Sequence, residues 1–259
     1  MVIHRLPLMM QREWAQQCHE LIGTTEPGTD ELTLSKPRSR CPHCSHAITA
    51  LENIPVLSYL ALKGRCKECK APISKRYPLI ELFTAGISAI VAWHFGFGIA
   101  VVGALLLSWS LLALTFIDVD HQLLPDSITL PLLWLGLSFN LFDIYTDISS
   151  AVIGAIAGYL ALWLVYHAFR LVTGKEGMGY GDFKLLAALG AWMGWQALPM
   201  IILLSSLVGA LVGISLILLK QQHRDIPIPF GPYLAAAGWL ALIWGDALTT
   251  GYLNWSGLS

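Results

Sequence analysis

Two short segments place acidic side chains directly beside long apolar runs. The first spans residues 116–126 and reads FIDVDHQLLPD. The second spans residues 177–184 and reads GMGYGDFK. The acidic residues of the two segments are Asp118, Asp120, Asp126 and Asp182. An ionisable group at the edge of a membrane span is costly to bury, so these carboxyl groups are candidates for a functional role.

Two carboxyl groups that share one site cannot easily both be ionised, so such a pair keeps a proton near neutral pH. The ionised member can take a proton from water while the protonated member polarises a peptide carbonyl, as in aspartic proteases. Gly179 and Gly181 would let a substrate backbone approach closely and let the chain turn into a helix at Asp182. Simpler interpretations stay open, with Asp182 and Asp126 as helix caps and Asp120 as a solvated side chain.

Four of the five cysteines form two CxxC pairs. Cys41 and Cys44 make the first pair, Cys66 and Cys69 make the second, and 21 residues separate the two. Such knuckles supply four thiolates to a tetrahedral zinc ion and leave no open position for catalysis. Two disulfides are the alternative, but a cytoplasmic location keeps thiols reduced and favours the metal. We therefore expect a structural zinc ion in a region too loop-rich to bury a large core.

The composition indicates that these groups are positioned by membrane helices. Of the 259 residues, 55% are hydrophobic and 13% are charged, whereas about 25% are charged in an ordinary soluble domain. Runs of about 18 or more nearly charge-free residues indicate membrane-spanning helices. The expected spans cover residues 79–97, 99–117, 128–142, 151–171, 185–198, 199–219 and 232–250. We predict an all-α polytopic membrane protein with about seven transmembrane helices and a small N-terminal zinc-binding domain.

Charge divides the chain into two parts. Residues 1–78 hold 11 basic and 7 acidic residues, a balance of +4, and residues 79–259 hold 5 basic and 10 acidic residues, a balance of −5. If residues 1–78 are cytoplasmic and the spans alternate, all 16 basic residues face the cytoplasm, as the positive-inside rule requires. Both acidic segments then lie on that same side of the membrane. No nucleic-acid partner is needed to explain the basic charge.

Taken together, these features resemble the bacterial type IV prepilin peptidases. These are bifunctional leader peptidase/N-methyltransferases of the GxGD class of intramembrane aspartic proteases. The resemblance runs over nearly the whole chain and includes four motifs besides the acidic segments and the CxxC pairs. These motifs are HRLP at 4–7, ENIP at 52–55 followed by SY at 58–59, RYP at 76–78 followed by Glu81, and PIPFGP at 227–232.

The resemblance implies a role for particular residues. The catalytic pair is Asp118 and Asp182, with Asp118 preferred to Asp120 because archaeal relatives look similar at the first aspartate of this segment. The residues implied to support the active site are Gly179, Gly181, Asp120 and Asp126. Gly64 and Arg65 match a glycine-plus-basic pair associated with methylation, although such a pair in a turn also has a structural interpretation. Residues 1–78 would then be a methyltransferase-associated zinc domain, and residues 79–259 a transmembrane aspartic peptidase domain.

The resemblance also implies the substrates and the reaction. The partners are prepilins of type IV pili and pseudopilins of type II secretion, cut after a glycine on the cytoplasmic side of the inner membrane. The new N-terminal residue is then methylated with S-adenosylmethionine. Family members have a further hydrophobic helix before the segment similar to residues 1–7, so we expect seven spans here and eight in the family. The spacing of Gly209 and Gly213 fits close packing between helices, so dimerisation of the chain is an open alternative.

Two functions of other classes compete with this interpretation. A transporter or ion-binding membrane protein would use the four aspartates as a proton or cation relay. That function explains the carboxylates but neither the CxxC pairs nor the GxGD segment. A structural scaffold with a zinc-ribbon domain needs no carboxylate pair. Other intramembrane proteases are disfavoured, because the sequence contains neither an HExxH nor a GxSG motif.

Overall fold

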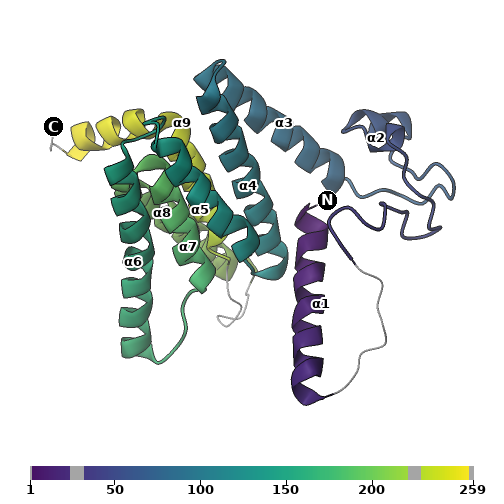
Figure 1. Ribbon diagram of the computed structural model, residues 1–259, viewed down its shortest axis with the longest axis horizontal. Helices are drawn as coiled ribbons and strands as arrows, with labels where there is room; N and C mark the ends of the chain where they lie inside the picture. Colours follow the sequence, from purple (N-terminus) through teal and green to yellow (C-terminus); the bar gives the residue numbers. More distant parts are fainter. Residues whose placement is uncertain (1, 24–31, 221–228, 257–259) are drawn as a thin grey trace. The chain divides into compact units, whose positions relative to one another are not determined.

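The computed structural model describes residues 2–23, 32–220 and 229–256, and these are mostly helical (Figure 1). Over these residues strand pairing is confined to two isolated bridges, so the predicted all-α class is confirmed. Two short 3₁₀ helices, η1 (Leu51–Asn53) and η2 (Trp195–Ala197), accompany the α-helices. The α-helices are α1 (Val2–Ile22), α2 (Leu57–Ala61), α3 (Arg76–Phe95), α4 (Ile99–His121), α5 (Asp126–Asn140), α6 (Ile148–Thr173), α7 (Tyr180–Met193), α8 (Leu198–Lys220) and α9 (Gly231–Ser256).

The chain folds into two compact units, Met1–Ile90 and Val91–Ser259. The expected domain boundary after residue 78 lies near the start of α3, whereas the two units divide inside that helix. The first turns of α3 therefore belong to the N-terminal unit. Each unit is described by itself below.

Helix α7 is the centre of the C-terminal unit, and its side chains from 185 to 192 are all buried. Helix α6 crosses it at very short range, because Gly154 and Gly190 face each other without side chains. A Cβ added to Gly190 would lie 2.2 Å from the Gly154 carbonyl oxygen. Small residues permit this kind of backbone approach between helices in membranes. The central helix is thus held against α6 by direct backbone contact at these glycines and by side-chain packing, as where the Tyr159 and Tyr166 rings meet Phe183.

Helix α5 packs on the other side of α7 and anchors its end. The Trp192 indole N–H donates to the Leu132 carbonyl oxygen at 2.8 Å. The buried Asn140 amide donates to the carbonyl oxygens of Ala191 at 2.9 Å and Trp192 at 3.0 Å. Its own oxygen accepts from the Tyr145 backbone N–H at 3.0 Å. A buried amide is stable only when its hydrogen bonds are made, so this network fixes where α7 ends.

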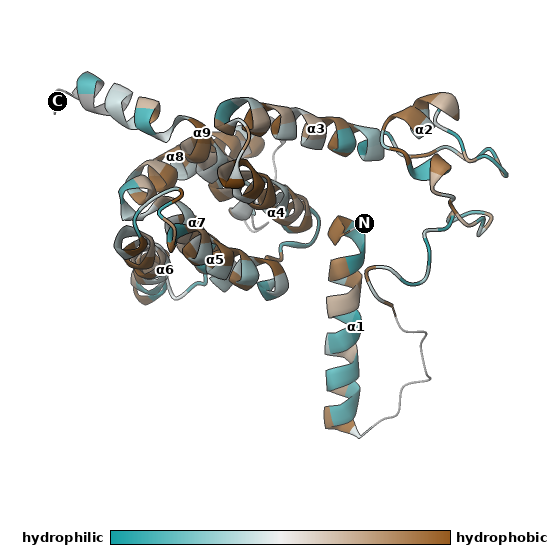
Figure 2. Ribbon diagram, turned by 45° about the horizontal axis from the view of Figure 1, so that its top comes forward, coloured by the Kyte–Doolittle hydropathy of each residue, from teal (hydrophilic) through white to brown (hydrophobic). Residues whose placement is uncertain are grey.

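Four helical segments of the described chain are long and apolar enough to cross a membrane. They are Arg76–Phe95, Ile99–His121, Ile148–Thr173 and Trp195–Leu216. They match the expected spans 79–97, 99–117, 151–171 and 199–219. Large apolar side chains such as Trp109, Ile153, Leu160 and Leu211 are exposed on them, which suits a hydrocarbon environment rather than water. Figure 2 shows the largely hydrophobic α4 and α5 in contrast with the mixed surface of α1.

The other three expected spans are helices that differ from the expectation in length or regularity. Helices α5 and α7 have 15 and 14 residues, so they extend only about 22 and 21 Å against about 30 Å of hydrocarbon. Helix α9 is interrupted by non-helical angles at Trp244. The helix expected over 185–198 begins five residues earlier, at Tyr180, because the glycine-rich segment ends directly in its first turn. Seven complete spans are therefore not seen in the described chain.

Between α1 and α3 the N-terminal unit is built mainly from loops. Helix α1 lies at its start, and the Arg5 guanidinium group donates to the carbonyl oxygens of Thr33 at 3.1 Å and Leu34 at 3.3 Å and to that of Pro37. These bonds connect α1 to the chain that leads into the first CxxC pair. Buried side chains are few in this unit, so it needs some other source of folding free energy.

Candidate functional site

Two of the predicted aspartates meet inside the C-terminal unit. Asp118 lies in the last turn of α4 and Asp182 lies in the first turn of α7, and each is only 6% exposed. Both carboxyl groups lie around Leu124, because a Cβ on Gly231, whose N–H donates to Asp118, and a Cβ on Gly181, which precedes Asp182, would each lie within 3.1 Å of that side chain. Asp120, two residues along α4, is exposed. The fold therefore brings together the two carboxyl groups that the sequence singled out and leaves the third outside.

A third element, the start of α9, completes the surroundings of Asp118. The Gly231 backbone N–H donates to Asp118 Oδ2 at 3.0 Å, across 113 residues of sequence. A Cβ at Gly231 would lie 2.6 Å from the same oxygen and 3.1 Å from Leu124 Cδ2. Only glycine allows this approach without displacing the carboxylate.

Gly231 belongs to the PIPFGP motif, but no individual role was predicted for it from the sequence. A glycine followed by proline directly before an apolar run is a pattern typical of a helix start. That signal could have located the beginning of α9, but not its contact with Asp118. Residues 227 and 228 of the motif lie outside the described residues.

The two glycines of the GxGD segment have different surroundings. A Cβ on Gly181 would lie 2.7 Å from Leu124 Cβ, so this glycine lets the first turn of α7 pack against the chain that follows α4. A Cβ on Gly179 would meet nothing nearer than Asp182 Oδ2 at 3.9 Å. Gly181 thus has a packing reason within the fold. The space beside Gly179, next to Asp182, is open.

Asp126 forms an ion pair instead of a helix cap. Helix α5 begins at Asp126, its N-cap is Pro125, and that cap makes no side-chain hydrogen bond, so the cap interpretation of Asp126 is wrong. The Lys184 ammonium group lies 2.7 Å from both carboxylate oxygens of Asp126. Asp182 is not the cap of α7 either, because that position is Gly179. The pair of Asp126 and Lys184 ties the start of α5 to the first turns of α7.

The four cysteines of the CxxC pairs form one cluster in the N-terminal unit. The Sγ atoms of Cys41 and Cys69 lie 3.7 Å apart and those of Cys44 and Cys66 lie 3.9 Å apart. All four sulfurs lie within 4.8 Å of one another, and none is in a disulfide. Four Zn–S bonds of about 2.3 Å in a tetrahedron place the sulfurs about 3.8 Å apart. The cluster can therefore hold a metal ion of the expected kind.

The two CxxC pairs are held by the same backbone arrangement. In the first knuckle the Cys41 N–H donates to the His46 carbonyl oxygen at 2.9 Å, and in the second the Cys66 N–H donates to that of Ala71 at 2.8 Å. Each knuckle also ends in an isolated bridge. The residue after each second cysteine has a positive φ, of 58° and 59°. Because the same hydrogen bonds and turn occur twice, the local backbone of each knuckle positions its two cysteines in the same way.

The cluster is electrostatically incomplete without a cation. Backbone N–H groups of His43 and Cys44 lower the pKa of the Cys41 thiol to about 6. At Cys69 the Ala71 N–H favours the thiolate, but burial and the three neighbouring sulfurs outweigh it and raise the pKa to about 11. The crowded sulfurs therefore disfavour a thiolate at Cys69, and a cation bound among them would offset that penalty.

Gly64 and Arg65, the weakly supported methylation pair, lie at the start of the second knuckle. Gly64 has a φ of +69°, and a Cβ there would lie 2.8 Å from Tyr59 Oη. Both facts require glycine for structural reasons. Arg65 is exposed and makes the isolated bridge to Pro72. A role for this pair in methylation stays a prediction.

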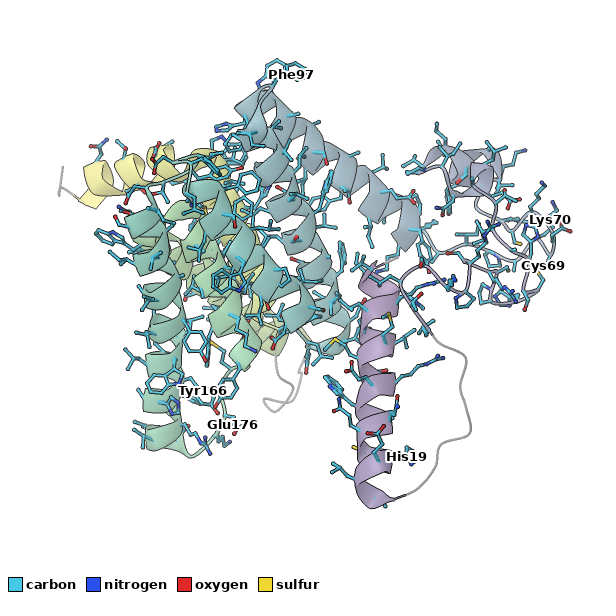
Figure 3. All side chains as sticks on the ribbon, viewed as in Figure 1. His19, Cys69, Lys70, Phe97, Tyr166 and Glu176 are labelled. Carbon is cyan, nitrogen blue, oxygen red and sulfur yellow. The ribbon has the colours of Figure 1, made fainter. Side chains whose placement is uncertain are left out.

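A cavity of about 740 Å³ opens beside the cluster, wholly within the N-terminal unit. Figure 3 shows the loops that carry Cys69 and Lys70. Glu52 is its best-ordered acidic group, since Oε2 accepts from the Thr49 N–H at 2.9 Å and lies 3.2 Å from His46 Nε2. The Thr49 hydrogen bond, aided by His46, lowers the pKa of Glu52 to about 2, so this side chain is a carboxylate at neutral pH.

Helices long and apolar enough to cross a membrane, together with two carboxyl groups buried side by side, define the class of this protein. It is an integral membrane protein that carries a potential acid–base pair. Family models identify it more closely: the type IV leader peptidase family matches residues 105–214, and the bacterial peptidase A24 N-terminal domain matches residues 1–95.

Several curated relatives cover nearly the whole chain, and each is named prepilin leader peptidase/N-methyltransferase. The protein of Aeromonas hydrophila is 62% identical over 255 residues, which are 98% of this chain and 88% of that protein. The protein of Pseudomonas aeruginosa is 57% identical over 257 residues, 99% of this chain and 89% of that protein. The chain belongs to the type IV leader peptidase family. No solved structure matches it.

Proposed function

We propose that this protein is a prepilin leader peptidase and N-methyltransferase that works in the bacterial inner membrane. The observation that carries the peptidase assignment is the burial of Asp118 and Asp182 together, at the end of one helix and the start of another. Near-full-length identity of about 60% to proteins of that name supports both activities. A transporter with a relay of four aspartates is disfavoured because only two of the four are buried.

The hydrogen bonds suggest a division of roles within the pair. Asp118 accepts the Gly231 N–H, which stabilises a carboxylate, so Asp118 would take a proton from the attacking water. Asp182 Oδ1 is buried and finds no hydrogen-bond partner among the described residues, so it would carry the shared proton to the scissile carbonyl oxygen. Asp118 would then return its proton to the leaving amine as the C–N bond breaks, and Asp182 would take back the proton from the hydroxyl group formed on the carbonyl oxygen. Each carboxyl group ends the cycle in its starting state.

The substrates follow from the proposed activity. They are prepilins and the pseudopilins of type II secretion, cut after a glycine on the cytoplasmic side, where the basic N-terminal unit would also lie. The open space beside Gly179 is the place where the substrate backbone would pass Asp182. The seven-span topology and the catalytic pair are parts of this proposal. So is the assignment of zinc to the cysteine cluster and of S-adenosylmethionine to the methyl transfer.

The test is cleavage of a membrane-embedded prepilin by the full chain and by Asp118→Asn and Asp182→Asn. Each substitution keeps the shape of the side chain but removes acid–base chemistry, so we expect cleavage to fall by about 10²- to 10⁴-fold. Asp120→Asn tests the competing first carboxylate and should lose far less, because Asp120 is exposed. Full cleavage by either variant of the pair would overturn the assignment. Methyl transfer to a pre-cleaved substrate should persist in all three variants.

A further inference from the structure

The cavity of the N-terminal unit has the size of a small-molecule site. Its volume of about 740 Å³ falls within the range of about 300–1,000 Å³ that is typical of ligand pockets. Its walls come from both cysteine knuckles, from α2, and from the first turns of α1 and α3. The metal cluster that holds the two knuckles together therefore also shapes this cavity.

Motifs that the peptidase mechanism leaves without a role converge on this cavity. The lining includes members of the segments 4–7, 52–55, 58–59 and 76–78, together with Glu81. These segments lie far apart in the sequence, and they are the ones through which the N-terminal part of the chain resembles its family. Because these segments all line one cavity, we infer that they bind a common ligand rather than each stabilising a different part of the unit.

The lining carries charges of both signs. Glu52 Oε1 is buried and accepts no hydrogen bond within the described chain, although the exposed Lys67 ammonium group lies 3.5 Å away. Glu81 Oε2 accepts the Val56 N–H at 2.7 Å, which holds this β-branched residue at the unusual φ of 59°. Arg5 adds a cation to the lining. A buried acceptor without a hydrogen bond can bind a hydrogen-bond donor or a cation of a ligand, and this interaction stabilises the complex.

We propose that this cavity binds S-adenosylmethionine, with Glu52 and Glu81 facing its positively charged groups. The inference rests on the proposed N-methyltransferase function and assigns that function a site. The donor is a zwitterion that carries a sulfonium, an ammonium and a carboxylate group beside an adenosine. A lining with two carboxylates, nearby cations and the aromatic rings of Tyr59 and Tyr77 matches that set of groups.

The donor supplies a methyl group bound to a positively charged sulfur. In the transfer, the free N-terminal amine of the substrate forms the new N–C bond while the C–S bond breaks and its electron pair stays on sulfur. One proton leaves the nitrogen to water. No oxidant or further reactant is needed, so the chain has only to bind the donor, exclude competing nucleophiles and admit the amine.

Two other assignments fit the structure less well. A second cavity, in the C-terminal unit, is lined by apolar residues such as Ala157, Trp195, Leu198 and Ile202 and offers no charged partner. A basic peptide segment of the substrate could enter the N-terminal cavity instead. However, the lining carries Arg5, Arg40 and Lys67 beside its two carboxylates, and these cations suit the carboxylate group of the donor but have no counterpart in a basic peptide.

The experiment is photo-crosslinking of labelled S-adenosylmethionine to the detergent-purified full chain, followed by peptide mapping and a binding titration. We expect crosslinks within residues 46–81. Glu52→Gln keeps the Thr49 hydrogen bond but removes a charge, so donor affinity should fall about tenfold or more. Glu68→Gln is the matched control, because Glu68 lies inside the second CxxC pair and outside the cavity lining. Asn53→Leu, at an exposed position of the lining, tests the site without touching the Glu52 network.

The outcomes separate this inference from the proposed function. Crosslinks outside the cavity, or wild-type donor affinity in both Glu52→Gln and Asn53→Leu, would overturn the cavity assignment while leaving methyl transfer itself intact. Failure of the wild-type protein to bind the donor or transfer a methyl group, with cleavage retained, would instead refute the methyltransferase half of the proposed function. Crosslinking of a prepilin leader peptide in the cavity would show that the cavity binds the peptide, and it would overturn the assignment of the cavity to the methyl donor. Metal content of one equivalent in each variant verifies that the unit is folded.

Discussion

The two units of this protein position their functional groups by different physical means. In the C-terminal unit the groups lie on helices, and the helices approach closely because glycines such as Gly154, Gly181 and Gly231 leave out a side chain. In the N-terminal unit the chain between α1 and α3 is mostly loop, few side chains are buried, and four cysteines gather where a metal can join them. One unit obtains rigidity from packed backbone and the other from ligation.

The difference follows from what each part of the chain can bury. Apolar helices in a membrane satisfy their own backbone hydrogen bonds and need only close packing to hold a polar site in place. A basic segment of about 80 residues cannot build a sufficient core, and metal binding supplies folding free energy that the side chains do not. We therefore expect the two units to respond differently to the same kinds of change.

Removal of one metal ligand should produce the largest difference between the units. Cys41→Ser leaves three thiolates, so we expect the metal to be lost, residues 41–69 to lose protection from hydrogen exchange, and methyl transfer to fall at least tenfold. Cleavage should persist within a few-fold, because Asp118 and Asp182 lie in the other unit. Cys18→Ser is the control, since Cys18 is exposed and outside the cluster. One equivalent of metal retained by Cys41→Ser would disprove the ligand assignment.

A single methyl group at the start of α9 should have the next largest effect, confined to cleavage. In Gly231→Ala the new Cβ would stand 2.6 Å from Asp118 Oδ2, so the carboxylate must move. Displacements of this order cost about 10- to 100-fold in rate. We expect the loss in kcat rather than in KM, with metal content and methyl transfer unchanged.

Gly245→Ala provides the matched control for that measurement. It makes the same substitution on the same helix, where a Cβ would meet nothing within 4 Å. Equal cleavage rates of Gly231→Ala and Gly245→Ala would mean that the close contact between α9 and Asp118 is not required for cleavage.

The pair of Asp126 and Lys184 should show the smallest effect. Both side chains are partly exposed, 54% for Asp126 and 28% for Lys184, and such pairs contribute about 0.2–1 kcal/mol. A double-mutant cycle with Asp126→Asn and Lys184→Met, read by thermal unfolding, should give a coupling in that range. Cleavage in the charge-swapped double variant should recover most of what either single charge reversal loses. A much larger loss in Asp126→Asn alone, without rescue, would assign Asp126 a direct role in substrate handling.

Long apolar helices were predictable because a charge-free run of about 20 residues has few alternatives. Helices α3, α4, α6 and α8 accordingly lie where the composition places them. Helix α7 is different, because its length is set by a turn at Gly179 and by the Asn140 amide at its other end. Neither determinant is visible in a hydropathy pattern.

The CxxC spacing was sufficient to predict a four-sulfur cluster, since the local backbone geometry of each knuckle is encoded within a few residues. The pairing of Asp118 with Asp182 was predicted from the family resemblance of two motifs. Both carboxyl groups are buried in the fold, and their joint catalytic role stays a prediction. The cavity of the N-terminal unit was not predicted. Its lining consists of side chains from segments that lie tens of residues apart in the sequence. Whether these segments come together depends on the conformation of the loops between them, which hydrophobic periodicity does not predict.

By itself the sequence determined the helical class, four helices of membrane-spanning length, the cysteine cluster and the identity of two buried carboxyl groups. These properties depend on composition and on local spacing. Tertiary structure alone decided that Gly231 would donate to Asp118, that Asp126 would pair with Lys184, and that three of the four motifs would surround one cavity. The physical reason is that each of these contacts joins residues far apart in the chain, where only packing and chain connectivity determine which atoms become neighbours.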